Sequence, residues 1–121
     1  MIYTSNFSKL NHSLDSGASI FQGREWVGIV RIPPKDVHPD ITFNTVIAPS
    51  RKLLKQIKAK EITEEQYHQA YIRQLNQIGV NNIIKLYDNK VLLCYCGEHS
   101  FCHRHILREW LANQGIQSLE I

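Results

Sequence analysis

The sequence predicts a single α/β domain over residues 1–121, with a mainly parallel sheet of about four strands and helices on both of its faces. The length of 121 residues suits one hydrophobic core, since domains commonly contain about 100–150 residues. The hydrophobic fraction of 43% is ordinary for a globular protein. Short apolar runs alternate with segments of helical spacing, an order typical of parallel sheets joined by right-handed crossovers. The expected arrangement is Rossmann-like.

Four strands are expected where short runs are rich in apolar and β-branched residues: residues 1–4, 25–31, 90–95 and 116–121. A turn-rich stretch, residues 12–23, separates the first two strands. Pro33 and Pro34 end the second strand, because proline cannot donate a ladder hydrogen bond. Residues 41–44 fit either a loop or an edge strand.

Helical spacing is found in four segments: about 51–59, the stretch between Thr63 and Gly79, residues 80–87, and residues 102–113. Ser50 is a good N-cap for the first of these helices. Thr63 and Gln66 fit a capping box at the start of the second, and Gly79 is placed to end it. The last helix is amphipathic.

The charge is mildly basic, with 14 Lys and Arg against 11 Asp and Glu and a formal net charge of +3. The run from Arg51 to Lys60 holds cations and no acid. At helical spacing Arg51, Lys55 and Lys58 share one side, which fits either a solvated helix face or a surface that meets phosphates. This helix is therefore the best candidate surface for a nucleic acid.

The 3 cysteines, Cys94, Cys96 and Cys102, lie close together. An odd number in one segment makes a poor disulfide framework and suits a thiol or metal site in a reducing compartment. No apolar run approaches the roughly 20 residues that cross a bilayer, and no signal-peptide pattern is present. A cytoplasmic protein without a membrane partner is expected, and the sequence identifies no cofactor.

A site is expected where the parallel strands end, because ligands bind beyond the carboxyl ends of the strands in such sheets. Cys102 lies at a predicted helix N-terminus, where N–H groups and the helix dipole favour an anion or a thiolate. We therefore expect Cys102 as the nucleophile, or as a structural neighbour of it, and His103 as the acid–base partner. The residues expected to bind a phosphate-bearing ligand, a nucleotide or a nucleic acid, are Arg104, Arg31, Ser5, Asn6, Cys94 and Arg51.

Structural interpretations stand beside these roles. Cys94 fits a small buried hydrophobe in an apolar strand, and His103 fits a partly buried histidine that bonds a loop. Zinc is a further alternative, with thiolate and imidazole ligands available from Cys94, Cys96, His99, Cys102, His103 and His105. The Cys-x-Cys spacing argues against it, because structural zinc sites usually have two to four residues between paired cysteines.

The segments Leu93–Tyr95 and Phe101–Leu107 resemble the Cys-x₇-Cys-His-Arg signature of the DUF488 family (domain of unknown function 488). Other segments resemble the compact form of this family, known from phages and bacteria: residues 2–7, 28–31, 48–50 with 53–54, and 61–67. The resemblance implies an α/β domain and a role for Cys94, Cys102, His103 and Arg104. It implies no settled activity. Where the family tends to have a glutamate, this chain has Cys96, with Glu98 nearby.

Three hypotheses follow. The first is an enzyme-like domain for a phosphate-bearing ligand, with thiol-based catalysis. The second is a non-catalytic phage or mobile-element accessory module that binds a nucleotide or a host protein. It is favoured if Cys102 and His103 are buried and bonded to the core. The third is a zinc-stabilised domain.

Overall fold

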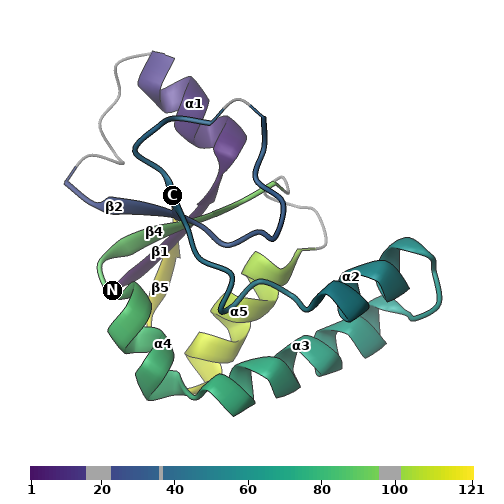
Figure 1. Ribbon diagram of the computed structural model, residues 1–121. Helices are drawn as coiled ribbons and strands as arrows, with labels where there is room; N and C mark the ends of the chain where they lie inside the picture. The colour runs from purple at the N-terminus through teal and green to yellow at the C-terminus, as the bar shows by residue number, and fades with distance from the viewer. Residues whose placement is uncertain (16–22, 36, 96–101) are drawn as a thin grey trace.

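The computed structural model describes residues 1–15, 23–35, 37–95 and 102–121. Its strands form one wholly parallel sheet in the order β3-β2-β4-β1-β5 (Figure 1). The strands are β1 (Ile2–Asn6), β2 (Glu25–Gly28), β3 (Thr42–Phe43), β4 (Lys90–Cys94) and β5 (Ser118–Glu120). The predicted α/β class is confirmed, with a fifth strand at the segment that the sequence left open between loop and edge strand.

The Rossmann-like part of the prediction is not confirmed. In the Rossmann order the first and second strands are neighbours, whereas here β4 lies between β1 and β2. The second strand is also shorter than expected, because it ends at Gly28 rather than Arg31.

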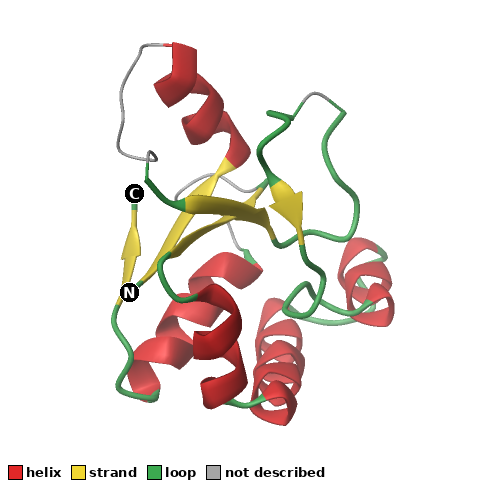
Figure 2. Ribbon diagram, turned by 60° about the vertical axis from the view of Figure 1, so that its left-hand side comes forward, coloured by secondary structure: helices red, strands yellow, loops and turns green. Residues whose placement is uncertain are grey.

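The helices are α1 (Phe7–Asp15), α2 (Arg51–Lys58), α3 (Glu64–Ile78), α4 (Val80–Tyr87) and α5 (His103–Asn113). Helix α1 lies on one face of the sheet and the other helices lie on the opposite face (Figure 2). No helix in the described ranges is both long enough and apolar enough to cross a bilayer.

Helix α1 corrects the first part of the expected turn-rich stretch, residues 12–15, whereas residues 16–22 lie outside the described residues. Its N-cap is Asn6, whose Oδ1 accepts a hydrogen bond of 2.7 Å from the backbone N–H of Lys9. Phe7 and Leu10 bury the apolar side of the helix. Phe7, Leu10 and Leu14 have helical spacing, but the helix is only nine residues long and was not predicted from the sequence.

The core has two parts, one on each face of the sheet. Leu92 packs into the part beneath α3, α4 and α5, whereas Val91 and Leu93 pack into the part on the α1 side. Strand β4 is therefore buried on both faces, as parallel strands between helical layers are.

The segment that precedes α2 is fixed by side chains of α3. The hydroxyl of Tyr71 donates to the carbonyl of Ile47 at 2.6 Å, and Gln74 Nε2 donates to the carbonyl of Ala48 at 2.7 Å. The capping box of Thr63 and Gln66 is confirmed at the start of α3. Helix α2 is thereby held beside α3, at the end of the helical layer (Figure 1).

Candidate functional site

The carboxyl ends of the central strands meet at one edge of the sheet. Asn6, the last residue of β1, is paired with Cys94, the last residue of β4. Cys102 is the N-cap residue of α5, and its Sγ lies 3.1 Å from the Sγ of Cys94. Both side chains are buried thiols rather than a disulfide. The predicted convergence of strand ends and the α5 N-terminus is present at this edge.

The imidazole of His103 is held between the backbone and the thiol of Cys102. Its Nε2 lies 3.0 Å from the carbonyl oxygen of Ile29, and its Nδ1 lies 3.8 Å from the Sγ of Cys102. A carbonyl only accepts, so Nε2 carries the proton in the neutral ring and Nδ1 presents its lone pair to the thiol. The ring of Tyr71 packs edge-on against the imidazole at 5.6 Å between centroids.

Arg104 is completely buried and its guanidinium contacts protein atoms. Nη1 donates to the carbonyl of Ser5 at 3.1 Å and to the Sγ of Cys94 at 2.9 Å. Nη2 forms an ion pair of 2.8 Å with Glu120 Oε2. Burial alone would lower the pKa of Arg104, but the charges of Cys94 and Glu120 raise it, so the group stays a cation. This cation favours the thiolate form of Cys94.

Ser5 and Asn6 also make contacts within the framework. The hydroxyl of Ser5 donates to the carbonyl of Ile121 at 2.8 Å, and Asn6 caps α1. Neither residue, nor Arg104, is among the residues that line the cavity described next. A direct ligand contact for these three residues stays a prediction.

A cavity of about 350 Å³ opens where Cys94, Cys102 and His103 meet. Two cations, Arg31 and Lys58, belong to its wall. The rest of the wall is apolar or aromatic: Val30, Ile32, Pro49, Leu54, Ile57, Tyr67 and Tyr95. Cys102 and His103 have little exposed area, yet both face this cavity. Sequence reasoning assigned Tyr67 and Tyr95 no role at a site, because Tyr67 belongs to the apolar stripe of α3 and Tyr95 ends the strand expected over residues 90–95.

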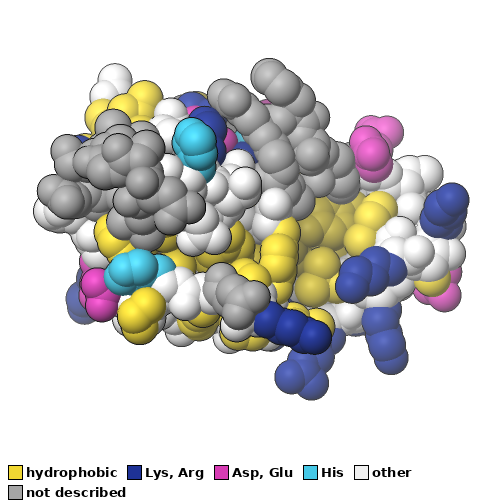
Figure 3. Space-filling view, turned by 90° about the horizontal axis from the view of Figure 1, so that it is seen from above, with side chains coloured by type: hydrophobic (Ala, Val, Ile, Leu, Met, Phe, Trp, Pro, Cys, Tyr) yellow, Lys and Arg dark blue, Asp and Glu magenta, His cyan; other side chains and the backbone are white. Residues whose placement is uncertain are grey.

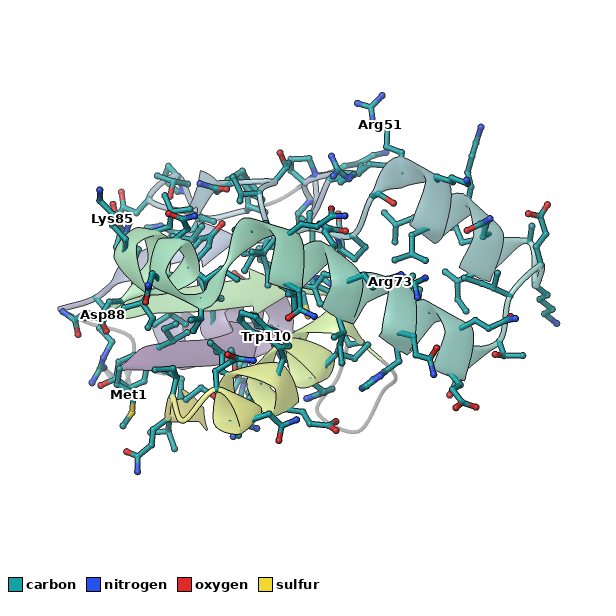
Figure 4. All side chains as sticks on the ribbon, turned by 90° about the horizontal axis from the view of Figure 1, so that it is seen from below. Met1, Arg51, Arg73, Lys85, Asp88 and Trp110 are labelled. Carbon is teal, nitrogen blue, oxygen red and sulfur yellow. The ribbon has the colours of Figure 1, made fainter. Side chains whose placement is uncertain are left out.

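A basic groove adjoins the cavity and shares four lining residues with it: Arg31, Ile32, Leu54 and Lys58. Further cations of α2 line this groove: Arg51, Lys52 and Lys55. Figure 3 shows Lys and Arg side chains around a hollow floored by hydrophobic side chains, and Figure 4 shows Arg51 projecting outward from α2. Among the described residues that line the groove, Glu61 is the acidic one. The groove therefore has a positive potential beside the thiols.

Arg31 stands at the boundary between groove and cavity. Its Nε donates a hydrogen bond of 2.5 Å to the carbonyl of Pro49, which orients the guanidinium. The predicted ligand residues Arg31, Arg51 and Cys94 are thus brought to one region, together with the predicted catalytic pair Cys102 and His103.

In the described part of the chain, no three His, Cys, Asp or Glu side chains come together in the way a metal ion requires. Cys96 and His99, which belong to the predicted zinc ligand set, lie outside the described residues.

A family model matches residues 12–115 and is described as the active DUF488-N3 subclade, DUF488-N3a. The chain belongs to the DUF488 family. The match includes every cavity-lining residue and confirms the resemblance noted from the Cys-His-Arg segment. No curated protein and no solved structure matches this DUF488 member.

Proposed function

We propose that this DUF488 member binds a phosphate-bearing ligand, a nucleotide or the end of a nucleic acid, at the carboxyl edge of its sheet. In this proposal Cys102 is the nucleophile. The observation that carries the proposal is the placement of two thiols and an imidazole in a cavity that adjoins a groove of cations.

The groove and cavity suit different parts of such a ligand. The cations of α2 attract phosphates, and the charge-assisted contacts of a guanidinium such as Arg31 orient them. The apolar and aromatic wall of the cavity, with Tyr67 and Tyr95, suits a base or sugar rather than a second charge. The reacting part of the ligand would then lie against the thiols.

His103 supplies the proton acceptor that a cysteine nucleophile needs. The Sγ of Cys102 passes its proton to Nδ1, and the carbonyl of Ile29 stabilises the resulting imidazolium through Nε2–H. Arg104 is a positioning residue, since its charge lies at the Sγ of Cys94 and not in the cavity. The description of the matching subclade as active supports an enzyme.

Binding is tested with a fluorescently labelled single-stranded oligonucleotide and a labelled nucleoside triphosphate. Binding should weaken with rising salt, because phosphate contacts release counterions. The variant Lys55→Ala, in the groove, should weaken binding several-fold. Lys85→Ala removes the same charge from an exposed position on α4, away from α2 (Figure 4), and should leave binding unchanged. A binding affinity that changes neither with salt concentration nor with the Lys55→Ala substitution would contradict the phosphate assignment.

The non-catalytic binding module remains the second candidate, favoured by the burial of Cys102 and His103 and by the bond of His103 to Ile29. Alkylation of Cys102 by iodoacetamide, followed by mass spectrometry across pH, separates the two. A midpoint below about 8.5, the ordinary thiol value, supports the nucleophile. Ligand binding together with an ordinary midpoint supports the module. Metal analysis of the purified protein tests the zinc alternative.

A further inference from the structure

The two described cysteines, Cys94 and Cys102, lie close enough together to form a disulfide bond after a small movement. The sulfur atoms of Cys94 and Cys102 are 3.1 Å apart, although the residues belong to different elements. A disulfide bond is about 2.05 Å long, so a shift of roughly 1 Å would join them.

Each sulfur also lies beside a group that favours its thiolate form. Cys102 faces the Nδ1 of His103, and the Sγ of Cys94 accepts from the Nη1 of Arg104 at 2.9 Å. A thiolate beside a second, cation-supported thiol is the arrangement in which an oxidised cysteine is resolved by its neighbour. Both residues line the cavity, so a small oxidant reaches them.

We propose that Cys94 and Cys102 are a site of reversible oxidation by a peroxide, with Cys102 as the residue that reacts first and Cys94 as the resolving residue. The inference rests on the thiolate of Cys102 in the proposed function, but it requires no phosphate ligand. A disulfide of this kind is compatible with a reducing compartment, where disulfides are transient.

The chemistry balances with hydrogen peroxide as the oxidant. The Cys102 thiolate attacks one peroxide oxygen, an S–O bond forms and the O–O bond breaks. The departing hydroxide takes the proton that Cys102 had passed to His103 and leaves as water. The Cys94 thiolate then attacks the Cys102 sulfur, the S–S bond forms, and the S–O bond breaks. The second hydroxide leaves as water with the proton that Cys94 gave up when it ionised. Two thiols are oxidised, and one peroxide is reduced to two waters.

Oxidation removes the nucleophile and changes the surroundings of Arg104. Its Nη1 loses a thiolate acceptor and keeps the carbonyl of Ser5, while Nη2 keeps Glu120. The oxidised protein therefore keeps the buried ion pair and its fold, but the cavity no longer holds a reactive thiolate.

The test uses the Cys96→Ser variant, which leaves Cys94 and Cys102 as the only cysteines in the chain. After brief treatment with hydrogen peroxide, both thiols should resist iodoacetamide, a non-reducing peptide map should show the Cys94–Cys102 link, and dithiothreitol should restore both. Replacing Cys94 as well, with Cys94→Ser, should trap a dimedone-reactive sulfenic acid on Cys102. The matched variant Cys102→Ser should give no comparable adduct on Cys94.

Peptide mapping of the peroxide-treated wild-type chain gives the same answer without any substitution, should a variant fail to fold. Two thiols that stay alkylatable after peroxide, or a Cys102 that passes directly to sulfinic acid while Cys94 is unchanged, would overturn the proposal. An alkylation midpoint of Cys102 below the ordinary value with no disulfide would reject this inference alone, whereas an ordinary midpoint would count against the proposed nucleophile.

Discussion

Arg104 and Glu120 are the most deeply buried charges that the structure pairs, with side chains 0% and 9% exposed. Glu120 is held in turn by the hydroxyl of Thr4, whose Oγ1 donates to Oε1 at 2.5 Å. A buried ion pair contributes little net stability over an apolar pair, but removal of one member leaves an uncompensated charge. At the scale of single residues, this pair fixes the guanidinium that supports Cys94.

The variant Glu120→Ala should therefore lower the free energy of unfolding by about 3–5 kcal/mol, the usual cost of breaking a buried pair. Urea denaturation at neutral pH measures it. Glu109→Ala removes the same charge from an exposed position on α5 and should change stability by less than about 0.5 kcal/mol. Equal effects of the two substitutions would show that the pair is structurally unimportant.

His103→Asn tests the proton acceptor. The alkylation rate of Cys102 at pH 7 should fall by about tenfold or more, because an ordinary thiol is only a few per cent ionised there. Quantitative mass spectrometry of the alkylated peptide gives the rate, and thermal unfolding shows whether the variant is folded. A folded variant that reacts as fast as the wild type would assign the imidazole a purely structural role.

The sequence could place Cys102 and His103 at a helix N-terminus, because that inference needs only local signals. It could not show that Arg104 is buried against Ser5, 99 residues away, and Glu120, 16 residues away. Such contacts depend on strand order, and a parallel sheet brings together residues that no local pattern links. The local sequence around an arginine at a strand end therefore does not distinguish one that binds a ligand from one that bonds to the protein backbone.

At the scale of elements, the edge strand β3 packs the ring of Phe43 directly over Gly28 of β2. A Cβ built on Gly28 would lie 2.5 Å from Cε1 and 2.6 Å from Cδ1 of the Phe43 ring, and 3.3 Å from the ring of Phe7. The ring of Phe43 thus occupies the space that any side chain at residue 28 would need. Sequence reasoning read this glycine only as part of an apolar strand.

Gly28→Ala should destabilise the protein by about 1–3 kcal/mol, the range for overpacking. A double-mutant cycle with Phe43→Ala checks the cause, since the cost should largely vanish once the ring is removed. Urea unfolding of the four proteins in the cycle gives the coupling. An unchanged cost without the ring would place the effect elsewhere.

Elements with strong local signals were predicted well, and those with weak signals were not. The α3 helix has its capping box and an apolar stripe of Tyr67, Tyr71 and Leu75, so periodicity and caps agree. Helix α1 was missed because it is only nine residues long, and so short a helix depends on the tertiary packing of residues such as Phe7 and Leu10. Strand β3 is two residues long, below the length at which alternation is visible.

For the whole molecule, buried tyrosines set how stability depends on alkaline pH. Burial raises the pKa of Tyr87 to about 12 and that of Tyr71 well above its usual value. The folded state therefore keeps these protons where the unfolded chain, with a tyrosine pKa of about 10, has lost them. Their contribution is complete below about pH 10 and is lost as the pH rises towards the folded-state pKa values.

Urea midpoints measured between about pH 9 and pH 11.5 should therefore fall steadily once the pH exceeds about 10. Tyr71→Phe should make the decline shallower. At neutral pH the same variant should lose about 1 kcal/mol, because the hydroxyl bond to Ile47 disappears. A decline as steep in the variant as in the wild type would exclude Tyr71 as its source.

The position of α2 at the margin of the fold bears on which substitutions the protein can tolerate during evolution. Cys94 belongs to the central strand β4 and Cys102 to the N-terminus of α5. Both are buried, so their amide hydrogens should exchange slowly. Apart from Arg31, the cations that line the groove and the cavity belong to an eight-residue helix at the margin, with their side chains in solvent. Under the proposed function, substitutions on this one short helix would change which ligands bind and would leave the thiols unchanged.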